Sequence, residues 1–529
     1  MVSAESLYKD KAVNKISNIK PFEWAVVEKK RLVERQDFVH IAVLVTIALV
    51  IGVYLIATTV LISKDGTLYI ECAKMIADNP VKAVHDIQVP PGYPFLIYLM
   101  HKAAGVFYDT QSLQGWIISA QAVSLLSKLI ATIALYFVGS YFVGSRLSFW
   151  GVLILSILPD SVGYGSDALT DWPNVMFLAI GFLLLLLGVR YRKPWIFGCA
   201  GIAGGLGYLV RPECGQVVLY GIAWLLFNLI RPQDKMKRTK AAGALLLLLA
   251  GFGIIAIPYM QSKGYVFPEQ LIWKLPALLS MSYDNIGSVL NTNMYRAGLS
   301  IGKIIGNDTL VNNMCETLLY YFVPALLTGS YYYFRRQPKK VEQTFFAAAF
   351  IVVNVAIALW QSSYRGLPLS RRYTLPLVAF TIFYIPVGFH IIACWLSSKT
   401  PRNGMAVEKN IRHWFFILIV IGIGICATKL VMITPLRWEK QGYRDAAEWL
   451  SKNTAPTDII AVTDMRIVFY AERKGIGYSE QIPEQADYIV RVIKSGDKKQ
   501  DSGENINEKY STWVNSHKKG KLVICKAIR

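Results

Sequence analysis

Residues 38–65 read FVHIAVLVTIALVIGVYLIATTVLISKD, a long apolar run that ends in a polar Ser-Lys-Asp. About 20 apolar residues let a helix cross the hydrocarbon core of a bilayer, so 38–62 is predicted to be a transmembrane helix. The run is too long for the core of a signal peptide, and nothing resembling a cleavage site follows it. The carboxyl group of Asp65 is therefore predicted to lie just outside the membrane.

Similar apolar runs recur along the chain, and the composition excludes a set of soluble domains. Of the 529 residues, 54% are hydrophobic and 17% charged, whereas soluble domains have roughly 45–50% and about 25%. We therefore expect an all-α polytopic membrane domain over residues 38–436, with about eleven transmembrane helices plus interfacial helices. The predicted spans are 38–62, 116–143, 147–159, 172–189, 195–210, 214–230, 241–260, 316–334, 343–360, 373–396 and 413–434.

The net charge of +21 indicates how the chain is oriented in the membrane. Lys and Arg gather in the N-terminal segment 1–37 and in alternate connections, and such residues favour the cytoplasmic side. No basic stretch forms a motif that reads a nucleic-acid groove, so no nucleic-acid partner is expected. An odd number of spans then places the C-terminus outside, in a multi-pass protein of a bacterial or archaeal cytoplasmic membrane. The basic connections are 190–193, 231–240, 335–340 and 398–413.

Three of the predicted outer segments are longer than plain loops between packed spans: 63–115, 261–315 and 361–373. Early in the first segment, apolar residues recur at helical spacing, which predicts an amphipathic helix lying in the membrane interface. The sequence Pro90-Pro91-Gly92 then breaks the chain before a second short apolar helix. The residues that set the spacing are Leu68, Cys72, Met75 and Ile76.

Acidic residues occur in two of the outer connections. Asp65 follows the first span, and Asp167 and Asp171 lie in the short connection 159–173. An ionised carboxylate near membrane depth is costly and normally faces protein or a wet cavity. Asp65 and Asp171 either cap the helices that follow them or belong to a polar site, and one residue can do both.

The order of these motifs resembles that of a known superfamily. SKDGTLYIECAKMIA, PPGYP, ALTDWP, GYLVRPE and RRYTLP follow one another and fall on one side of the predicted membrane domain. This order is similar to that of the GT-C membrane glycosyltransferases, in the branch of the protein O-mannosyltransferases and the aminoarabinose transferase acting on lipid A. The resemblance implies a polyprenyl-phosphate-linked sugar donor and transfer on the outer face. Of the acids that it implies, one matches Asp65 and another matches Asp171.

Glycosyl transfer needs a carboxylate that removes the proton of the attacking hydroxyl. Asp65 is our candidate base, and Asp171 is expected to hold the acceptor or orient the base. The leaving lipid phosphate needs fixed cations, for which arginine provides paired donors. Three arginines on the outer side are candidates for this role, although ion pairing with Glu213 or placement at the interface would also explain them. They are Arg211, Arg371 and Arg372.

Three further residues are candidates for an acceptor cleft: Glu71, Tyr93 and Asp167. The acids of the aminoarabinose branch can bind a metal, but the residues near Asp65 do not lead us to predict one, and the cofactor stays open. The expected partners are the lipid-linked sugar, membrane lipids, and a lipid, protein or glycan acceptor.

After Leu436 the composition becomes that of a soluble domain. Residues 437–529 are predicted to form a small extracytoplasmic α/β domain, with a helix over 442–453 and strands near 458–462, 486–493 and 521–528. Two other functions remain as alternatives. One is a secondary transporter, and the other is an oligosaccharyltransferase or glycan polymerase that uses a diphosphate-linked donor.

Overall fold

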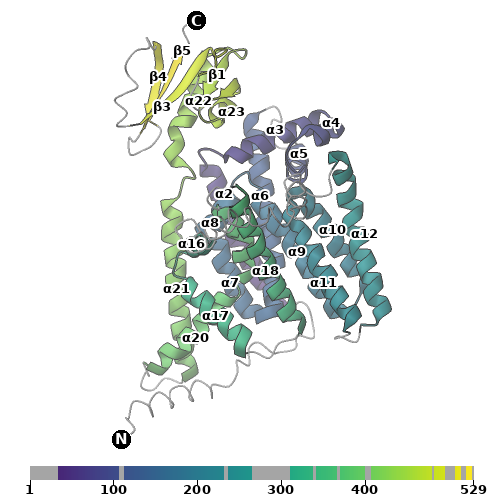
Figure 1. Cartoon of the computed structure of the whole chain (residues 1–529). Coiled ribbons are helices and arrows are strands. Elements are labelled where there is room, and N and C mark those ends of the chain that lie inside the picture. Colours follow the sequence, from purple (N-terminus) through teal and green to yellow (C-terminus); the bar gives the residue numbers. More distant parts are fainter. Residues whose placement is uncertain are drawn as a thin grey trace, which may run out of the picture.

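The computed structural model shows a bundle of helices with a small mixed α/β domain at one end (Figure 1). The description covers residues 34–105, 112–231, 236–264, 310–336, 341–365, 370–399, 407–478, 482–494, 507–513 and 520–526. The predicted cytoplasmic segment 1–37 lies almost wholly outside the described residues, as does most of the predicted outer segment 261–315.

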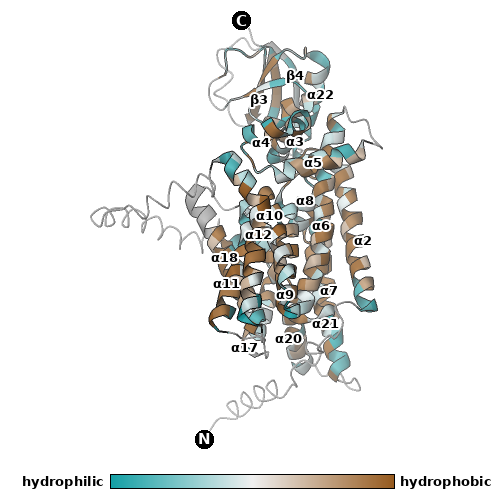
Figure 2. Cartoon of the chain, turned by 90° about the vertical axis from the view of Figure 1, so that its right-hand side faces the viewer, coloured by the Kyte–Doolittle hydropathy of each residue, from teal (hydrophilic) through white to brown (hydrophobic). Residues whose placement is uncertain are grey.

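Apolar helices make up the bundle, whose flanks are hydrophobic over most of their height (Figure 2). Among the described residues, seven helices are long and apolar enough to cross a membrane, or up to nine if two bent pairs each count as one span. The expected number of about eleven is therefore not confirmed. The seven lie within α2 (Arg35–Thr58), α6 (Leu113–Val143), α9 (Asp171–Tyr191), η1 (Pro212–Gly215) with α11 (Gln216–Ile230), α12 (Arg238–Lys263), α18 (Val341–Arg365) and α21 (Val407–Met432).

Each of the two bent pairs has a sharp break between its helices. Helix α7 (Ser145–Ile157) meets α8 (Pro159–Gly165) at 68°, and η2 (Arg371–Thr374) with α19 (Leu375–Thr381) meets α20 (Tyr384–Lys399) at 62°. The predicted span 195–210 is present as α10 (Pro194–Val210), whereas the predicted span 316–334 is shortened to α17 (Val323–Arg336). Helix α16 (Leu310–Thr317) is short.

The centre of the bundle is aromatic. The ring of Phe182 on α9 makes edge contacts with Phe346, Phe350 and Phe380. Helices α10 and α12 approach so closely that a Cβ atom on Gly201 would overlap the carbonyl oxygen of Leu248. Small residues allow such backbone approach between membrane helices, where packing replaces the hydrophobic effect as the main attraction.

Three short helices cover one end of the bundle: α3 (Lys64–Asp78), α4 (Pro80–Asp86) and α5 (Gly92–Ala104). The predicted amphipathic helix is present as α3, and the chain breaks before Gly92 as expected. However, Leu68 and Met75 are exposed, so the predicted apolar face is only partly right. The buried face keeps Cys72 and Ile76 but also includes Ile70 and Ala73, which pack in one cluster with residues of α5 and α6. The buried residues of α3 are Gly66, Ile70, Cys72, Ala73 and Ile76.

Described residues of two basic connections lie at the opposite end of the bundle. The first turn of α9 and the last turn of α10 are joined by an ion pair between Asp171 and Arg211. The connection 190–193 between these two helices must therefore lie at the far end, where the basic segment before α12 also lies (Figure 1). This separation of charge agrees with the predicted orientation, while the side of the membrane itself stays a prediction.

The C-terminal domain contains a five-stranded sheet in the order β2-β1-β3-β5-β4. Strand β1 is parallel to β2 and β3, whereas β5 is antiparallel to β3 and β4. The predicted helix and three predicted strands are present as α22, β1, β3 and β5, while β2 and β4 were not expected. The elements are η3 (Trp438–Lys440), α22 (Gln441–Asn453), β1 (Ile459–Val462), α23 (Arg466–Ala471), β2 (Lys474–Gly477), β3 (Tyr488–Lys494), β4 (Asn507–Trp513) and β5 (Gly520–Lys526).

Candidate active site

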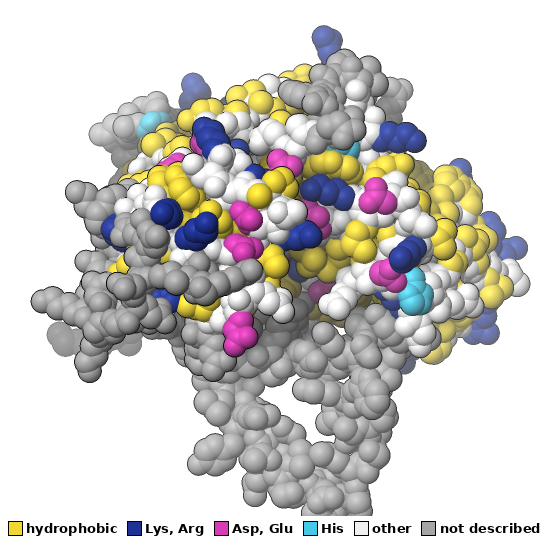
Figure 3. All heavy atoms as spheres, turned by 90° about the horizontal axis from the view of Figure 1, so that it is seen from above, with side chains coloured by type: hydrophobic (Ala, Val, Ile, Leu, Met, Phe, Trp, Pro, Cys, Tyr) yellow, Lys and Arg dark blue, Asp and Glu magenta, His cyan; other side chains and the backbone are white. Residues whose placement is uncertain are grey.

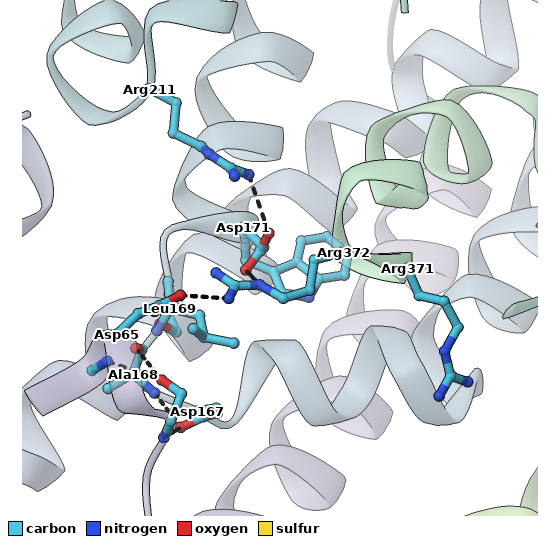
Figure 4. Close-up of polar contacts among 12 residues, drawn as sticks. Asp65, Asp167, Ala168, Leu169, Asp171, Arg211, Arg371 and Arg372 are labelled. Atoms are coloured by element: carbon cyan, nitrogen blue, oxygen red, sulfur yellow. Dashed lines mark hydrogen bonds and ion pairs between the residues drawn. The ribbon is translucent and has the colours of Figure 1, made fainter. Parts of the chain in front are cut away.

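Four charged side chains form one network at the end of the bundle that carries α3. Nη1 of Arg372 lies 2.6 Å from Oδ2 of Asp65, and Nε of the same guanidinium lies 2.9 Å from Oδ2 of Asp171. Nη1 of Arg211 lies 3.1 Å from the other oxygen of Asp171. Figure 4 shows these side chains converging from α3, α9, the end of α10 and η2. The structure therefore brings together four of the five residues singled out for catalysis and phosphate binding.

Local helix geometry explains how the acids reach this place. Asp65 lies in the first turn of α3, and Asp171 is the first residue of α9. Helix N-termini carry partial positive charge and stabilise carboxylates. The capping of α3 is done by Ser63, whose hydroxyl accepts a hydrogen bond from Gly66 N. Asp65 thus does not cap the backbone, and its carboxylate is directed at Arg372 instead.

The four side chains differ in exposure. The side chain of Asp171 is 1% exposed, those of Arg211 and Arg372 are 14% and 23% exposed, and that of Asp65 is 49% exposed. Two carboxylates and two guanidinium groups balance in charge, which offsets part of the cost of burying the set. Asp171 is the buried centre of the network, and Asp65 is the member that faces outward.

Two tyrosines, which the sequence did not single out, border the network. The guanidinium of Arg211 lies 5.2 Å from the centre of the Tyr373 ring, a cation–π distance. Tyr69 lies near Arg211 and Asp65, and burial raises the pKa of its phenol. The sequence contained a signal for both, since Tyr69 follows Asp65 by four residues on one helix face and Tyr373 directly follows Arg372.

Arg371 lies apart from this network. Its Nη1 is 3.5 Å from Oδ2 of Asp160, and its Nε is 3.6 Å from Oε2 of Glu316. Figure 4 shows its side chain pointing away from Arg372. The adjacent arginines of the RRYTLP motif therefore serve two different sets of acids, although the sequence grouped them.

The three candidates for an acceptor cleft lie in different surroundings. Asp167 is buried, accepts from Ser63 N and Ala168 N, and forms an ion pair with Arg437. The Tyr93 hydroxyl is buried and donates to the carbonyl oxygen of Ala120.

Glu71, by contrast, lies on the surface of α3, and its carboxylate pairs with Lys74 at 2.9 Å. Seen from above, basic and acidic side chains are interspersed on this end of the molecule (Figure 3). The three candidates thus differ in burial and in partners, and their role in an acceptor cleft stays a prediction.

A metal ion would need several ligating side chains around one point. Within the described residues, no group of three or more His, Cys, Asp and Glu side chains gathers in a way that could hold a metal. The two nearest carboxylates, of Asp65 and Asp171, already share the guanidinium of Arg372. In this arrangement the described residues do not fit a metal ion between the two acids.

Comparison with solved structures places this geometry in a known fold. ArnT from Cupriavidus metallidurans bound to undecaprenyl phosphate matches with a TM-score of 0.54 and 13% identity, over 93% of this chain and 98% of ArnT. The oligosaccharyltransferase AglB from Archaeoglobus fulgidus, in complex with an inhibitory peptide and a dolichol-phosphate, matches with a TM-score of 0.53 and 13% identity, over 86% of this chain and 69% of AglB.

The chain has the GT-C fold. Residues 88–257 also match the family model described as dolichyl-phosphate-mannose-protein mannosyltransferase. The matched segment contains Asp167, Asp171 and Arg211, whereas Asp65 and Arg372 lie on either side of it. A search of the curated proteins finds no match. The expected resemblance to GT-C glycosyltransferases and the expected polytopic fold with a small C-terminal sheet are thus confirmed.

Proposed function

We propose that this GT-C protein transfers a sugar from a polyprenyl-phosphate donor to an acceptor hydroxyl at the outer face of the membrane. The observation that carries the proposal is the shared guanidinium of Arg372, which joins the exposed carboxylate of Asp65 to the buried carboxylate of Asp171. The proposed base, Asp65, and the proposed phosphate-binding cation, Arg372, are therefore hydrogen-bonded to each other.

Arg211 and Arg372 hold the donor phosphate in this proposal. Both are charged at any physiological pH, and their planar guanidinium groups match the oxygens of a phosphate. Asp171 holds both arginines in place, because each of its two carboxylate oxygens forms an ion pair with one guanidinium group. Of the two roles suggested for Asp171 by the sequence, the proposal keeps the orienting of the base, because Arg372 links Asp171 to Asp65. Arg371 is not included, because it pairs with Asp160 and Glu316.

Asp65 serves as the general base. The acceptor oxygen attacks the anomeric carbon as the bond from that carbon to the phosphate oxygen breaks. The leaving polyprenyl phosphate keeps the electron pair of the broken bond, and the hydroxyl proton goes to the Asp65 carboxylate. One base and one displacement invert the anomeric centre. The growing negative charge on the phosphate is stabilised by the two arginines.

The compared proteins support the lipid part of this proposal. The ArnT structure is bound to undecaprenyl phosphate, and the AglB structure is in complex with a dolichol-phosphate and an inhibitory peptide. A polyprenyl phosphate is the component that the two have in common. We extend it to this chain because Arg211 and Arg372 provide the cations that a lipid phosphate requires.

The test is transfer by the purified protein in lipid nanodiscs. Polyprenyl-phosphate donors carrying labelled hexoses or pentoses are mixed with a membrane extract, and products are identified by mass spectrometry. We expect transfer by the unaltered protein and by Asp78→Asn, an exposed acid at the end of the same helix. With Asp65→Asn, transfer should fall by about a hundredfold or more, the usual contribution of a general base.

Equal rates for Asp65→Asn and Asp78→Asn would refute Asp65 as the base. Product only from a diphosphate-linked oligosaccharide would instead support the oligosaccharyltransferase alternative. Uptake of solute into sealed vesicles without any glycosyl product would support a transporter.

A further inference from the structure

The connection between α2 and α3 is unusual because it is buried without regular structure. Residues 60–63, called here the 60–63 connection, lead directly to Asp65. Leu61 and Ile62 are fully buried, and Ser63 is 7% exposed. Buried peptide groups must find hydrogen-bond partners, and a helix or strand normally provides them. Here the partners come from parts of the chain far away in sequence.

Two of these partners follow the last transmembrane helix. The amide of Val60 donates to the carbonyl oxygen of Leu436 at 3.1 Å. Nη1 of Arg437 donates to the carbonyl oxygen of Leu61 at 2.8 Å, while its Nη2 pairs with Asp167. Asp167 in turn accepts from the amide of Ser63 at 2.9 Å. The start and the end of the connection are therefore fixed to one network.

The middle of the connection is fixed by α23 of the C-terminal domain. The hydroxyl of Tyr470 accepts from the amide of Ile62 at 3.0 Å, and Nη1 of Arg466 donates to the carbonyl oxygen of the same residue at 3.3 Å. Arg466 is held by two further bonds to Asp464, at 2.9 Å and 2.7 Å. Arg466 and Asp464 are nearly fully buried in the interface.

Apolar and charged contacts extend this interface along α3. Phe469 and Tyr470 pack against the cluster that contains Ile62 and Ile70. Nζ of Lys64 lies 3.7 Å from the carboxylate of Asp464. Helix α23 and the preceding Asp464 thus lie against the 60–63 connection and against α3, the helix that carries Asp65.

We propose that the C-terminal domain clamps the 60–63 connection, and that Tyr470 and Arg466 are positioning residues for Asp65. The proposal rests on the proposed function, in which Asp65 is the base. A base must be held within a fraction of an ångström of its working position. Among the described residues, the exposed carboxylate of Asp65 forms an ion pair with Arg372 alone, so the backbone that carries it provides the remaining constraint.

The experiment compares pairs of conservative variants in the full-length protein. Tyr470→Phe removes the acceptor of the Ile62 amide and keeps the ring. Its control is Tyr478→Phe, which removes a hydroxyl that donates to Val490 within the sheet. Arg466→Lys keeps the charge beside Asp464 and loses the bond to Ile62. Its control is Arg473→Lys, whose guanidinium binds the carbonyls of Ser451 and Thr454 inside the domain.

Two readouts are measured on each variant. Hydrogen exchange of peptides covering residues 60–66 reports on the clamp and needs no donor sugar, so it tests the clamp even if the unaltered protein transfers nothing. Steady-state kinetics separate kcat from the KM values of donor and acceptor. For Tyr470→Phe and Arg466→Lys we expect faster exchange in 60–66 and a fall in kcat of about two- to tenfold, the effect of one net hydrogen bond, with both KM values unchanged.

The controls should leave exchange in 60–66 and kcat as in the unaltered protein. Equal changes in the controls would overturn the proposal, because they would show a general effect of altering the domain. A raised acceptor KM with unchanged exchange in 60–66 would also overturn it, because the domain would then act by contacting the acceptor. Faster exchange with unchanged kcat would leave a clamp without a role in positioning Asp65, and would equally refute the proposal.

Discussion

Nη1 of Arg372 lies 2.6 Å from Oδ2 of Asp65, although 307 positions separate the two residues in sequence. The candidate base and the candidate phosphate ligand are therefore each other's partners in the protein without substrate. A donor phosphate that binds Arg372 would compete with the Asp65 carboxylate for the same guanidinium group.

This pairing predicts that Asp65→Asn separates donor binding from transfer. Transfer should be lost, whereas the affinity for the polyprenyl phosphate should stay equal or rise, because Arg372 no longer has a competing carboxylate. The measurement is the Kd of polyprenyl phosphate by native mass spectrometry in detergent, with Asp78→Asn as the matched control. A Kd about tenfold weaker for Asp65→Asn, a loss of roughly 1.4 kcal/mol, would contradict competition between the carboxylate and the phosphate.

The neighbouring arginines predict unequal effects of the same substitution. Arg372→Lys should weaken donor binding by about tenfold or more, because lysine is a point charge that cannot bridge Asp171 and a phosphate with a planar fork. Arg371→Lys should have a smaller effect, since its partners are Asp160 and Glu316. Titration of both variants with polyprenyl phosphate gives their affinities. Equal losses of affinity would contradict the assignment of Arg372, and not Arg371, as a ligand of the donor phosphate.

Asp171 is predicted to matter for stability as well as for activity. Asp171→Asn would leave Arg211 and Arg372 without their shared buried carboxylate, and we expect a loss of about 2 kcal/mol, below the range for fully buried pairs because both arginines are partly exposed. Asp65→Asn should cost less, since Asp65 is half exposed. The melting temperatures of the two variants are compared by thermal unfolding in one detergent. A larger decrease for Asp65→Asn than for Asp171→Asn would contradict the assignment of Asp171 as the buried centre of the network.

The docking of the C-terminal domain is predicted to weaken in acid. Burial opposes ionisation of Asp464, but the hydrogen bonds and charge of Arg466, with Lys64 nearby, hold its pKa below the ordinary value. Because the folded pKa is the lower one, the ionised group contributes stability above the unfolded pKa, and this is lost as pH falls through the folded pKa. The protection factors of the amides in residues 60–66, which correct for the slower intrinsic exchange in acid, should therefore fall below about pH 4.

Asp464→Asn gives the control for this pH effect. The variant should show lower protection factors in residues 60–66 already at neutral pH, and these protection factors should change less as the pH falls. An acid response of the same size in the variant would assign the effect to other carboxylates.

Much of the fold follows from local pattern. The run 38–62 and the break at Pro90-Pro91-Gly92 could be predicted, because hydrophobicity and proline act on the chain within a few residues. The face on which α3 packs was only partly predictable. Leu68 and Ile70 are both apolar, and the position of α5 decides that Ile70 is the buried one.

The sequence by itself determined the class of protein, the positions of the candidate acids and arginines, and through them the resemblance to GT-C enzymes. Only the tertiary structure decided which charges meet. Adjacent Arg371 and Arg372 point to different acids, and Arg437 reaches Asp167 across 270 positions. The physical reason is that an ion pair forms only when two side chains lie within a few ångströms of each other. That distance is set by the packing of helices that lie far apart in the sequence.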